Sequence, residues 1–148
     1  MSYLQNYVEM GMSEVFADTS GWISSFISSE PHHVKAASLL TQCQQQNLQI
    51  VTTNYVLSKL VVLFTRFRVQ RSKALTYIRA IRDSTWIEVV HIDEKLDDQA
   101  WKLLEARLDK TWSLVDCASF VVMEDRGLTD ALTTDRHFEQ AGFVKLLS

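Results

Sequence analysis

Stretches typical of β-strands alternate with longer stretches typical of helices along almost the whole chain. The expected strands are short, apolar and β-prone, and they lie at 14–19, 48–52, 86–92, 131–134 and 143–147. The expected helices carry apolar residues at helical spacing, and they lie at 21–28, 33–47, 54–67, 70–84, 93–108, 114–126 and, for one or two turns, 135–141. Repeated strand–helix–strand order favours parallel pairing. We therefore predict an α/β fold in which a parallel sheet has helices on both faces.

The length of the chain, 148 residues, is that of one domain. With one proline and four glycines, the sequence has no stretch typical of a linker between two domains. Residues 1–12 have no clear strand or helix pattern, and we treat them as an N-terminal extension of uncertain role. Residues 13–148 are then expected to form the single α/β domain.

Several classes of protein are disfavoured by what the sequence contains. Two cysteines, Cys43 and Cys117, are too few for a disulfide framework, and no Cys/His spacing is typical of zinc. The longest apolar run covers residues 60–64, far short of a membrane span. The N-terminus lacks the pattern of a signal peptide. We therefore expect a cytoplasmic protein that does not bind the membrane.

Three aspartates occupy places that a parallel sheet would bring together. Asp18 and Asp135 each follow an expected strand, and Asp116 lies in the first turn of the apolar helix at 114–126. Taken singly, each could simply cap a helix. Gathered at the carboxyl edge of a sheet, however, three carboxylates would repel one another unless a cation neutralised them. Oxygen ligands suit Mg²⁺ or Mn²⁺, which can activate water against a phosphodiester.

Four stretches of the sequence resemble the acidic motifs of PIN domains, and the resemblance extends from about residue 13 to the C-terminus. These stretches are VFADTSGWI, TTNYVLSKL, WSLVDCASFVVM and ALTTDRHFEQAGF. The small VapC-like toxins of bacteria are the branch that the chain resembles most. The resemblance implies a three-layer α/β/α fold with a five-stranded parallel sheet and an endoribonuclease that uses Mg²⁺ or Mn²⁺. It also implies an RNA substrate, a cognate antitoxin and a homodimer.

The motifs assign roles to particular residues. Asp18, Asp116 and Asp135 match three acidic positions of the family, which implies that they are the catalytic residues and metal ligands. Hydroxyl residues match neighbouring positions, where they could orient a carboxylate or a water: Thr19, Ser20 and Thr134. His137, close to Asp135, could contact a phosphate, although lone histidines more often have structural roles.

The second motif departs from the family pattern, because Lys59 stands where family members carry a glutamate. Helical spacing places Lys59 on an apolar face, from which its side chain could extend into solvent. Alternatively, its ammonium group lies among Asp18, Asp116 and Asp135. There it would partly replace a cation, lower the affinity for metal and slow or abolish cleavage.

The net charge of −3 conceals a strongly basic stretch. Seven Lys and Arg residues and no acidic residue lie between positions 59 and 82. The best candidates for contact with RNA phosphates are Arg66, Arg68, Arg71, Arg79 and Arg82. The same two helices form dimer or antitoxin contacts in toxin-like relatives, and the charges could also be ordinary solvated helix faces.

Two functions from different classes remain open on the sequence alone. The first is a metal-dependent ribonuclease that acts as the toxin of a toxin–antitoxin pair. The second is a catalytically impaired PIN-like module that binds RNA or protein, and Lys59 is the feature that favours it. A nucleotide-binding α/β protein is less well supported, because the sequence contains neither GxGxxG nor GxxxxGK[ST].

Overall fold

The computed structural model describes residues 2–148 of the chain. Within this range a five-stranded, fully parallel sheet has the order β3-β2-β1-β4-β5. The strands are β1 (Glu14–Ala17), β2 (Gln49–Thr53), β3 (Ile87–Val90), β4 (Asp130–Leu132) and β5 (Val144–Lys145). The predicted fold class and number of strands are confirmed, and each strand lies within about two residues of its expected position.

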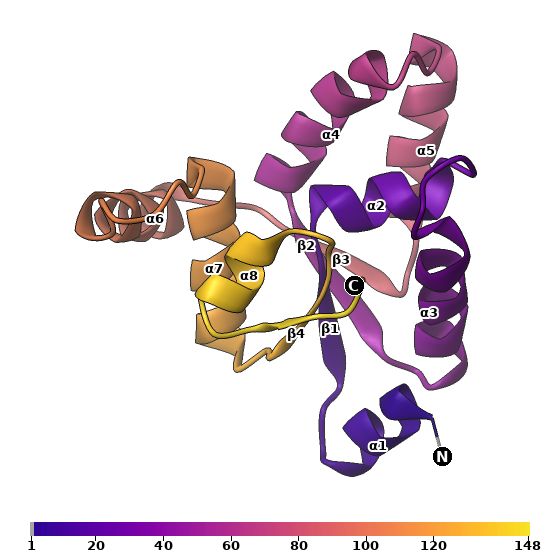
Figure 1. Ribbon diagram of the computed structural model, residues 1–148, viewed down its shortest axis with the longest axis horizontal. Coiled ribbons are helices and arrows are strands. Elements are labelled where there is room, and N and C mark those ends of the chain that lie inside the picture. Colours follow the sequence, from indigo (N-terminus) through magenta and orange to yellow (C-terminus); the bar gives the residue numbers. More distant parts are fainter. Residues whose placement is uncertain (1) are drawn as a thin grey trace.

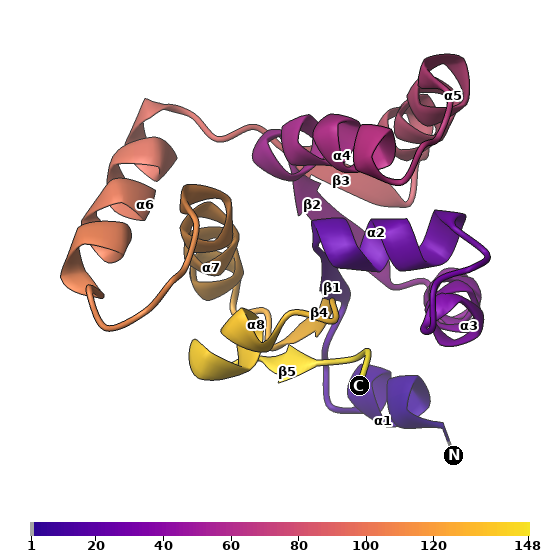
Figure 2. The ribbon, with the colours of Figure 1, turned by 45° about the horizontal axis from the view of Figure 1, so that its top comes forward.

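Helices cover both faces of the sheet, with α6 and α7 on one side of the strands and α2 and α3 on the other (Figure 1, Figure 2). Helices α4 and α5 form a hairpin that extends beyond the sheet (Figure 1). The helices are α1 (Tyr3–Glu9), α2 (Thr19–Phe26), α3 (His33–Gln45), α4 (Asn54–Arg66), α5 (Arg71–Asp83), α6 (Glu94–Ala106), α7 (Leu114–Arg126) and α8 (Arg136–Gln140). This is the predicted three-layer α/β/α arrangement.

The helix ends follow local rules that are visible in the sequence. Thr53 and Asp93 cap α4 and α6, because their side chains accept hydrogen bonds from Val56 N and Leu96 N. Gly127 ends α7 in the left-handed conformation, with a φ of 66°. This conformation is the one in which glycine commonly terminates a helix.

Helix α1 falls in the stretch for which the sequence pattern predicts no element. Ser2 begins it with a capping box, and Leu4 and Tyr7 are buried. The hydroxyl of Tyr7 donates to the carbonyl of Glu14 at 2.6 Å, which ties α1 to the amino end of β1. Residues 3–9 therefore pack at the amino edge of the sheet, opposite to the edge where β1 and β4 lead into Asp18 and Asp135. The domain boundary at residue 12 stays a prediction.

None of the helices over residues 2–148 combines the length and the apolar character that crossing a bilayer requires.

Candidate active site

The candidate site lies at the carboxyl edge of the sheet, where the neighbouring strands β1 and β4 end. Ala17 pairs with Leu132 in the last register position, and the Asp18 backbone N–H still donates to the Leu132 carbonyl at 3.2 Å. Each strand then turns into a helix, α2 after Asp18 and α8 after Asp135. Parallel pairing therefore brings together residues that are more than a hundred positions apart in the sequence.

The hydroxyl of Thr133 joins Asp18 to Asp135. It donates to Asp18 Oδ2 at 3.2 Å and accepts from the backbone N–H of Asp135 at 2.9 Å. The Thr133 hydroxyl has a single proton, which it donates to Asp18. In the 3.0 Å contact between Thr133 and Ser20, the donor is therefore Ser20 Oγ. Ser20 Oγ in turn accepts from the Thr134 backbone N–H at 2.9 Å. The network fixes the orientation of Asp18.

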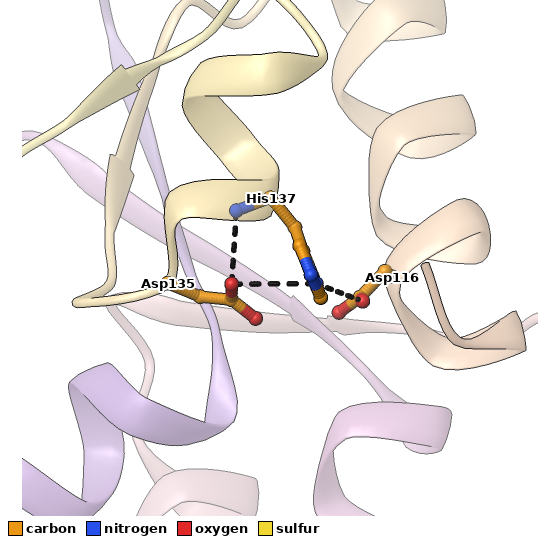
Figure 3. A group of neighbouring side chains, drawn as sticks. All are labelled: Asp116, Asp135 and His137. Atoms are coloured by element: carbon orange, nitrogen blue, oxygen red, sulfur yellow. Dashed lines mark hydrogen bonds and ion pairs between the residues drawn. The ribbon is translucent and has the colours of Figure 1, made fainter. Parts of the chain in front are cut away.

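Asp116 reaches the same place from α7. It is the third residue of that helix and forms a capping box, in which its side chain accepts from Ser113 N and its backbone N–H donates to Ser113 Oγ. The ring of His137 lies between Asp116 and Asp135 (Figure 3). Its Nδ1 is 3.0 Å from Asp116 Oδ2 and 3.4 Å from Asp135 Oδ1. Asp116 and Asp135 thus lie around one point at the edge of the sheet, and Thr133 links the Asp18 side chain to the Asp135 backbone beside it.

Asp18 is the most buried carboxyl of the group, with 2% of its surface exposed. Burial raises its pKa from 3.8 to about 6, and the charges of Asp116 and Asp135 add to the increase. A hydrogen bond from the Thr19 backbone and the positive charge of Lys59 lower the pKa but do not offset burial. The site therefore holds a carboxylate whose negative charge is not fully compensated.

Lys59 lies on α4 with its side chain partly buried. Its positive charge lowers the pKa of Asp18, so Lys59 lies close enough to act on that carboxyl. It forms no ion pair with a carboxylate anywhere in residues 2–148. The structure brings Lys59 near Asp18 without pairing it to an acid, and its effect on metal stays a prediction.

The candidate RNA contacts lie outside the carboxylate cluster. Arg66 ends α4, Arg68 lies in the loop that follows, and Arg71 begins α5. All five arginines are exposed, and none pairs with an acidic residue in the described part of the chain. Arg66 is seven residues beyond Lys59, or about 10 Å along the helix axis. A long ligand that extends from the site along α4 could therefore meet Arg66, and the RNA contacts of all five arginines stay a prediction.

Sequence reasoning passed over Thr133 and gave little importance to His137. The hydroxyl that joins the Asp18 carboxylate to the Asp135 backbone belongs to Thr133, whereas Thr134 contributes its backbone N–H. Either residue of the Thr-Thr pair fits the position by type, and only the exact end of β4 distinguishes them. The sequence does contain a signal for the position of His137. Asp135 was expected to cap a helix, and a residue two positions after the cap lies in the first turn, close to the capping side chain.

Replacement of Thr133 by valine is expected to lower the free energy of unfolding by about 2 kcal/mol. The substitution preserves shape, but it leaves the buried groups around Asp18 and Asp135 without their partner. The matched control is Thr134→Val, which keeps every backbone bond and should change stability by less than about 0.5 kcal/mol. Urea denaturation of the two variants measures the difference. Equal effects would contradict the role given to Thr133.

The donor set fits a divalent cation. Ligand atoms of Asp116, Asp135 and His137 lie within 4.8 Å of one another, and Asp18 is held beside them through Thr133. Three carboxylates and an imidazole supply the hard oxygen ligands that Mg²⁺ and Mn²⁺ take in proteins, together with one nitrogen. A cation there would also relieve the uncompensated charge of Asp18.

Comparison with known proteins identifies the family of the chain. The family model of the PIN domain matches residues 15–144 of the chain. The "23S rRNA-specific endonuclease VapC20" of two strains of Mycobacterium tuberculosis is 33% identical over 132 residues, which cover 89% of this chain and 97% of that protein.

A solved structure shares the fold. The crystal structure of Mycobacterium tuberculosis VapC20, described as a "Sarcin-Ricin loop cleaving toxin", superposes with a TM-score of 0.81 at 31% identity. The match covers 90% of this chain and 99% of that one. With the family model, the sequence relatives and the fold in agreement, the chain belongs to the PIN domain family.

Proposed function

We propose that this protein is a metal-dependent endoribonuclease and the toxin of a toxin–antitoxin pair. The observation that carries the proposal is the gathering of Asp18, Asp116 and Asp135 at the carboxyl edge of the sheet. The relative that is 33% identical is named a 23S rRNA-specific endonuclease, so 23S rRNA is the first substrate to test. An RNA substrate and a cognate antitoxin both agree with a cytoplasmic location.

In the proposed mechanism Asp18, Asp116 and Asp135 would hold Mg²⁺ or Mn²⁺. When bound, such an ion activates the attacking water and neutralises negative charge on the phosphate oxygens. Thr133 keeps the Asp18 carboxylate and the Asp135 backbone in position through the contacts described above, so that little reorganisation is needed. Thr19 and Ser20 belong to the same polar network around Asp18, and Thr134 joins it through its backbone.

The rest of the RNA is proposed to follow the α4–α5 hairpin. Arg66, Arg68 and Arg71 lie around its tip, and Arg79 and Arg82 lie along α5. Exposed guanidinium groups that have no acidic partner can neutralise backbone phosphates, and such binding weakens as salt rises. The contacts would hold the substrate without reading its sequence.

The same hairpin is the proposed contact for a second copy of the chain or for the antitoxin. Three large apolar side chains are exposed there and would be covered by such a contact: Val62, Phe67 and Leu75. We expect a homodimer, which light scattering on the purified protein would detect.

The alternative of a catalytically impaired module is not favoured, because the relatives that match nearly the whole chain are named as an endonuclease and a cleaving toxin. We propose instead that Lys59 weakens the affinity for metal without removing activity.

Replacement of Lys59 by glutamate is expected to raise the affinity for Mn²⁺ at least about tenfold. The change removes a positive charge that acts on Asp18 and adds a fourth carboxylate to the donor set. In metal-free buffer the variant should be less stable than the wild type, because the acids lose a compensating charge. Calorimetric titration with Mn²⁺ measures the affinity, and Lys73→Glu on α5 is the control. An unchanged affinity would show that Lys59 does not act on the metal.

The proposed function is tested by incubating the purified protein with 23S rRNA in Mn²⁺, in Mg²⁺ or in excess EDTA. Cleavage is expected with either metal and not with EDTA. The Asp116→Asn variant should lose about 1000-fold in rate, the equivalent of about 4 kcal/mol of transition-state stabilisation. Cleavage that persists in EDTA or in this variant would contradict the proposal.

A further inference from the structure

We propose that His137 Nδ1 is itself a ligand of the divalent ion, so that the site has a mixed nitrogen and oxygen donor set that favours Mn²⁺ over Mg²⁺. The inference rests on the proposed function and adds His137 to the three acidic residues that match the family. It concerns how the ion is held and which ion is preferred.

The position of the ring carries the inference. His137 Nδ1 lies 3.0 Å from Asp116 Oδ2 and 3.4 Å from Asp135 Oδ1, and it points between the two carboxylates (Figure 3). Ligand atoms of all three residues lie within 4.8 Å of one another. An ion bound by both carboxylates would therefore lie next to Nδ1, and it would meet the ring edge-on in the direction of the nitrogen lone pair.

The ring is held in this orientation by two further contacts. The His137 backbone N–H donates to Asp135 Oδ1 at 2.9 Å, which fixes the start of the side chain at the first turn of α8. On the far side of the ring, Nε2 lies 3.3 Å from Thr111 Oγ1. When Nε2–H donates to this hydroxyl, Nδ1 carries the free lone pair, as in metal sites where a ligating histidine bonds a second group through its other nitrogen.

A purely structural role makes a different prediction from the same geometry. In that role Nδ1–H would donate to Asp116 and hold the carboxylate in place, whether or not metal is present. A bound ion would then have oxygen ligands alone. The two roles differ most directly in whether a histidine nitrogen is bonded to the metal.

The nitrogen should also affect selectivity. Mg²⁺ is a hard ion that takes oxygen ligands, whereas imidazole binds first-row transition ions. Removal of the ring by His137→Gln should therefore lower the affinity for Mn²⁺ by about 10-fold or more and that for Mg²⁺ by clearly less. A role limited to positioning Asp116 would weaken the binding of both ions equally.

The test is pulsed electron paramagnetic resonance on the full-length protein loaded with Mn²⁺. Modulation from a directly bonded ¹⁴N nucleus is expected in the wild type and in a His32→Gln control, whose histidine precedes α3. The signal should disappear in His137→Gln. In wild-type protein labelled with ¹⁵N-histidine, the ¹⁴N modulation should be replaced by ¹⁵N modulation. This measurement needs no variant, so it does not depend on whether His137→Gln folds.

Two outcomes would overturn the inference, and they separate it from the proposed function. If Mn²⁺ binds in a manner that Asp116→Asn abolishes but no nitrogen modulation is seen, His137 is not a ligand and the proposed function stands. If Mn²⁺ binding is unaffected by Asp116→Asn, the ion is elsewhere and both proposals fail.

Discussion

Asp18→Asn is expected to stabilise the metal-free protein by about 2 kcal/mol at pH 7.5 while it lowers the rate of RNA cleavage about 1000-fold. Burial raises the pKa of Asp18 from 3.8 to about 6, so its ionised form is costly in the folded state. A shift of this size corresponds to about 3 kcal/mol. The expected gain in stability is smaller than this, because the asparagine side chain cannot accept the hydrogen bonds of both the Thr19 and the Thr133 hydroxyls.

The gain in stability should depend on pH. Between about pH 4 and pH 6 the unfolded chain has already released the Asp18 proton, whereas the folded protein still holds it. The contribution of this raised pKa to wild-type stability is therefore fully present below about pH 4 and is lost as the pH rises through about 6. The variant has no such loss, so it should exceed the wild type at pH 7.5 but not at pH 4.

Urea denaturation in EDTA at the two pH values measures the effect. Asp125→Asn is the control, because Asp125 is an exposed aspartate outside the site, and it should leave stability and cleavage within error of the wild type. Added Mn²⁺ should stabilise the wild type and not Asp18→Asn. A variant that is less stable than the wild type at pH 7.5 would show that Asp18 is not a strained carboxylate.

Gly21→Ala is expected to lower the free energy of unfolding by about 3 kcal/mol and cleavage about 100-fold. A Cβ at this position of α2 would lie 2.1 Å from the carbonyl oxygen of Leu132 and 2.8 Å from its carbon, both backbone atoms that cannot move aside cheaply. The same carbonyl accepts from Asp18 N–H, so a shift of α2 away from β4 also displaces Asp18. A displacement of about 1 Å at a catalytic group is enough for such a loss.

Gly127→Ala separates this clash from the general effect of removing a glycine. Gly127 has a φ of 66° and open space around it, so alanine there should cost about 1 kcal/mol through backbone strain alone and leave cleavage unchanged. Thermal denaturation and RNA cleavage of the two variants give the comparison. Equal stability of Gly21→Ala and the wild type would mean that α2 does not approach β4 as closely as described.

Most of the fold could be predicted, because the signals that produce it are local. Within residues 2–148, apolar periodicity located every strand and seven of the eight helices to within a few residues, and strand–helix alternation predicted the parallel sheet. Helix α1 was missed because its seven residues are too few for a clear period, and only Leu4 and Tyr7 are buried. Its stability comes from tertiary contacts such as the bond from Tyr7 to Glu14, which no local pattern reveals.

The site was predicted in outline through the motif resemblance, and its details depend on three-dimensional contacts. Residue type and order identified Asp18, Asp116 and Asp135, but not which atoms connect them. The role of Thr133 rests on where β4 ends, and that of His137 on how the first turn of α8 faces α7. The position of Lys59 near Asp18 also needed the structure, since helical spacing left it open whether the side chain turns toward the site or the solvent.

The central claim is that carboxylate-bound metal activates water for attack on RNA, and the chemistry of the cleaved ends tests it most directly. After cleavage of 23S rRNA in Mn²⁺, mass spectrometry should find linear phosphate monoesters at the new ends, because water is the nucleophile. A substrate whose scissile nucleotide lacks the 2′-hydroxyl should still be cut. Cyclic 2′,3′-phosphate ends, or resistance of that substrate, would show that the RNA's own hydroxyl attacks and would contradict the account.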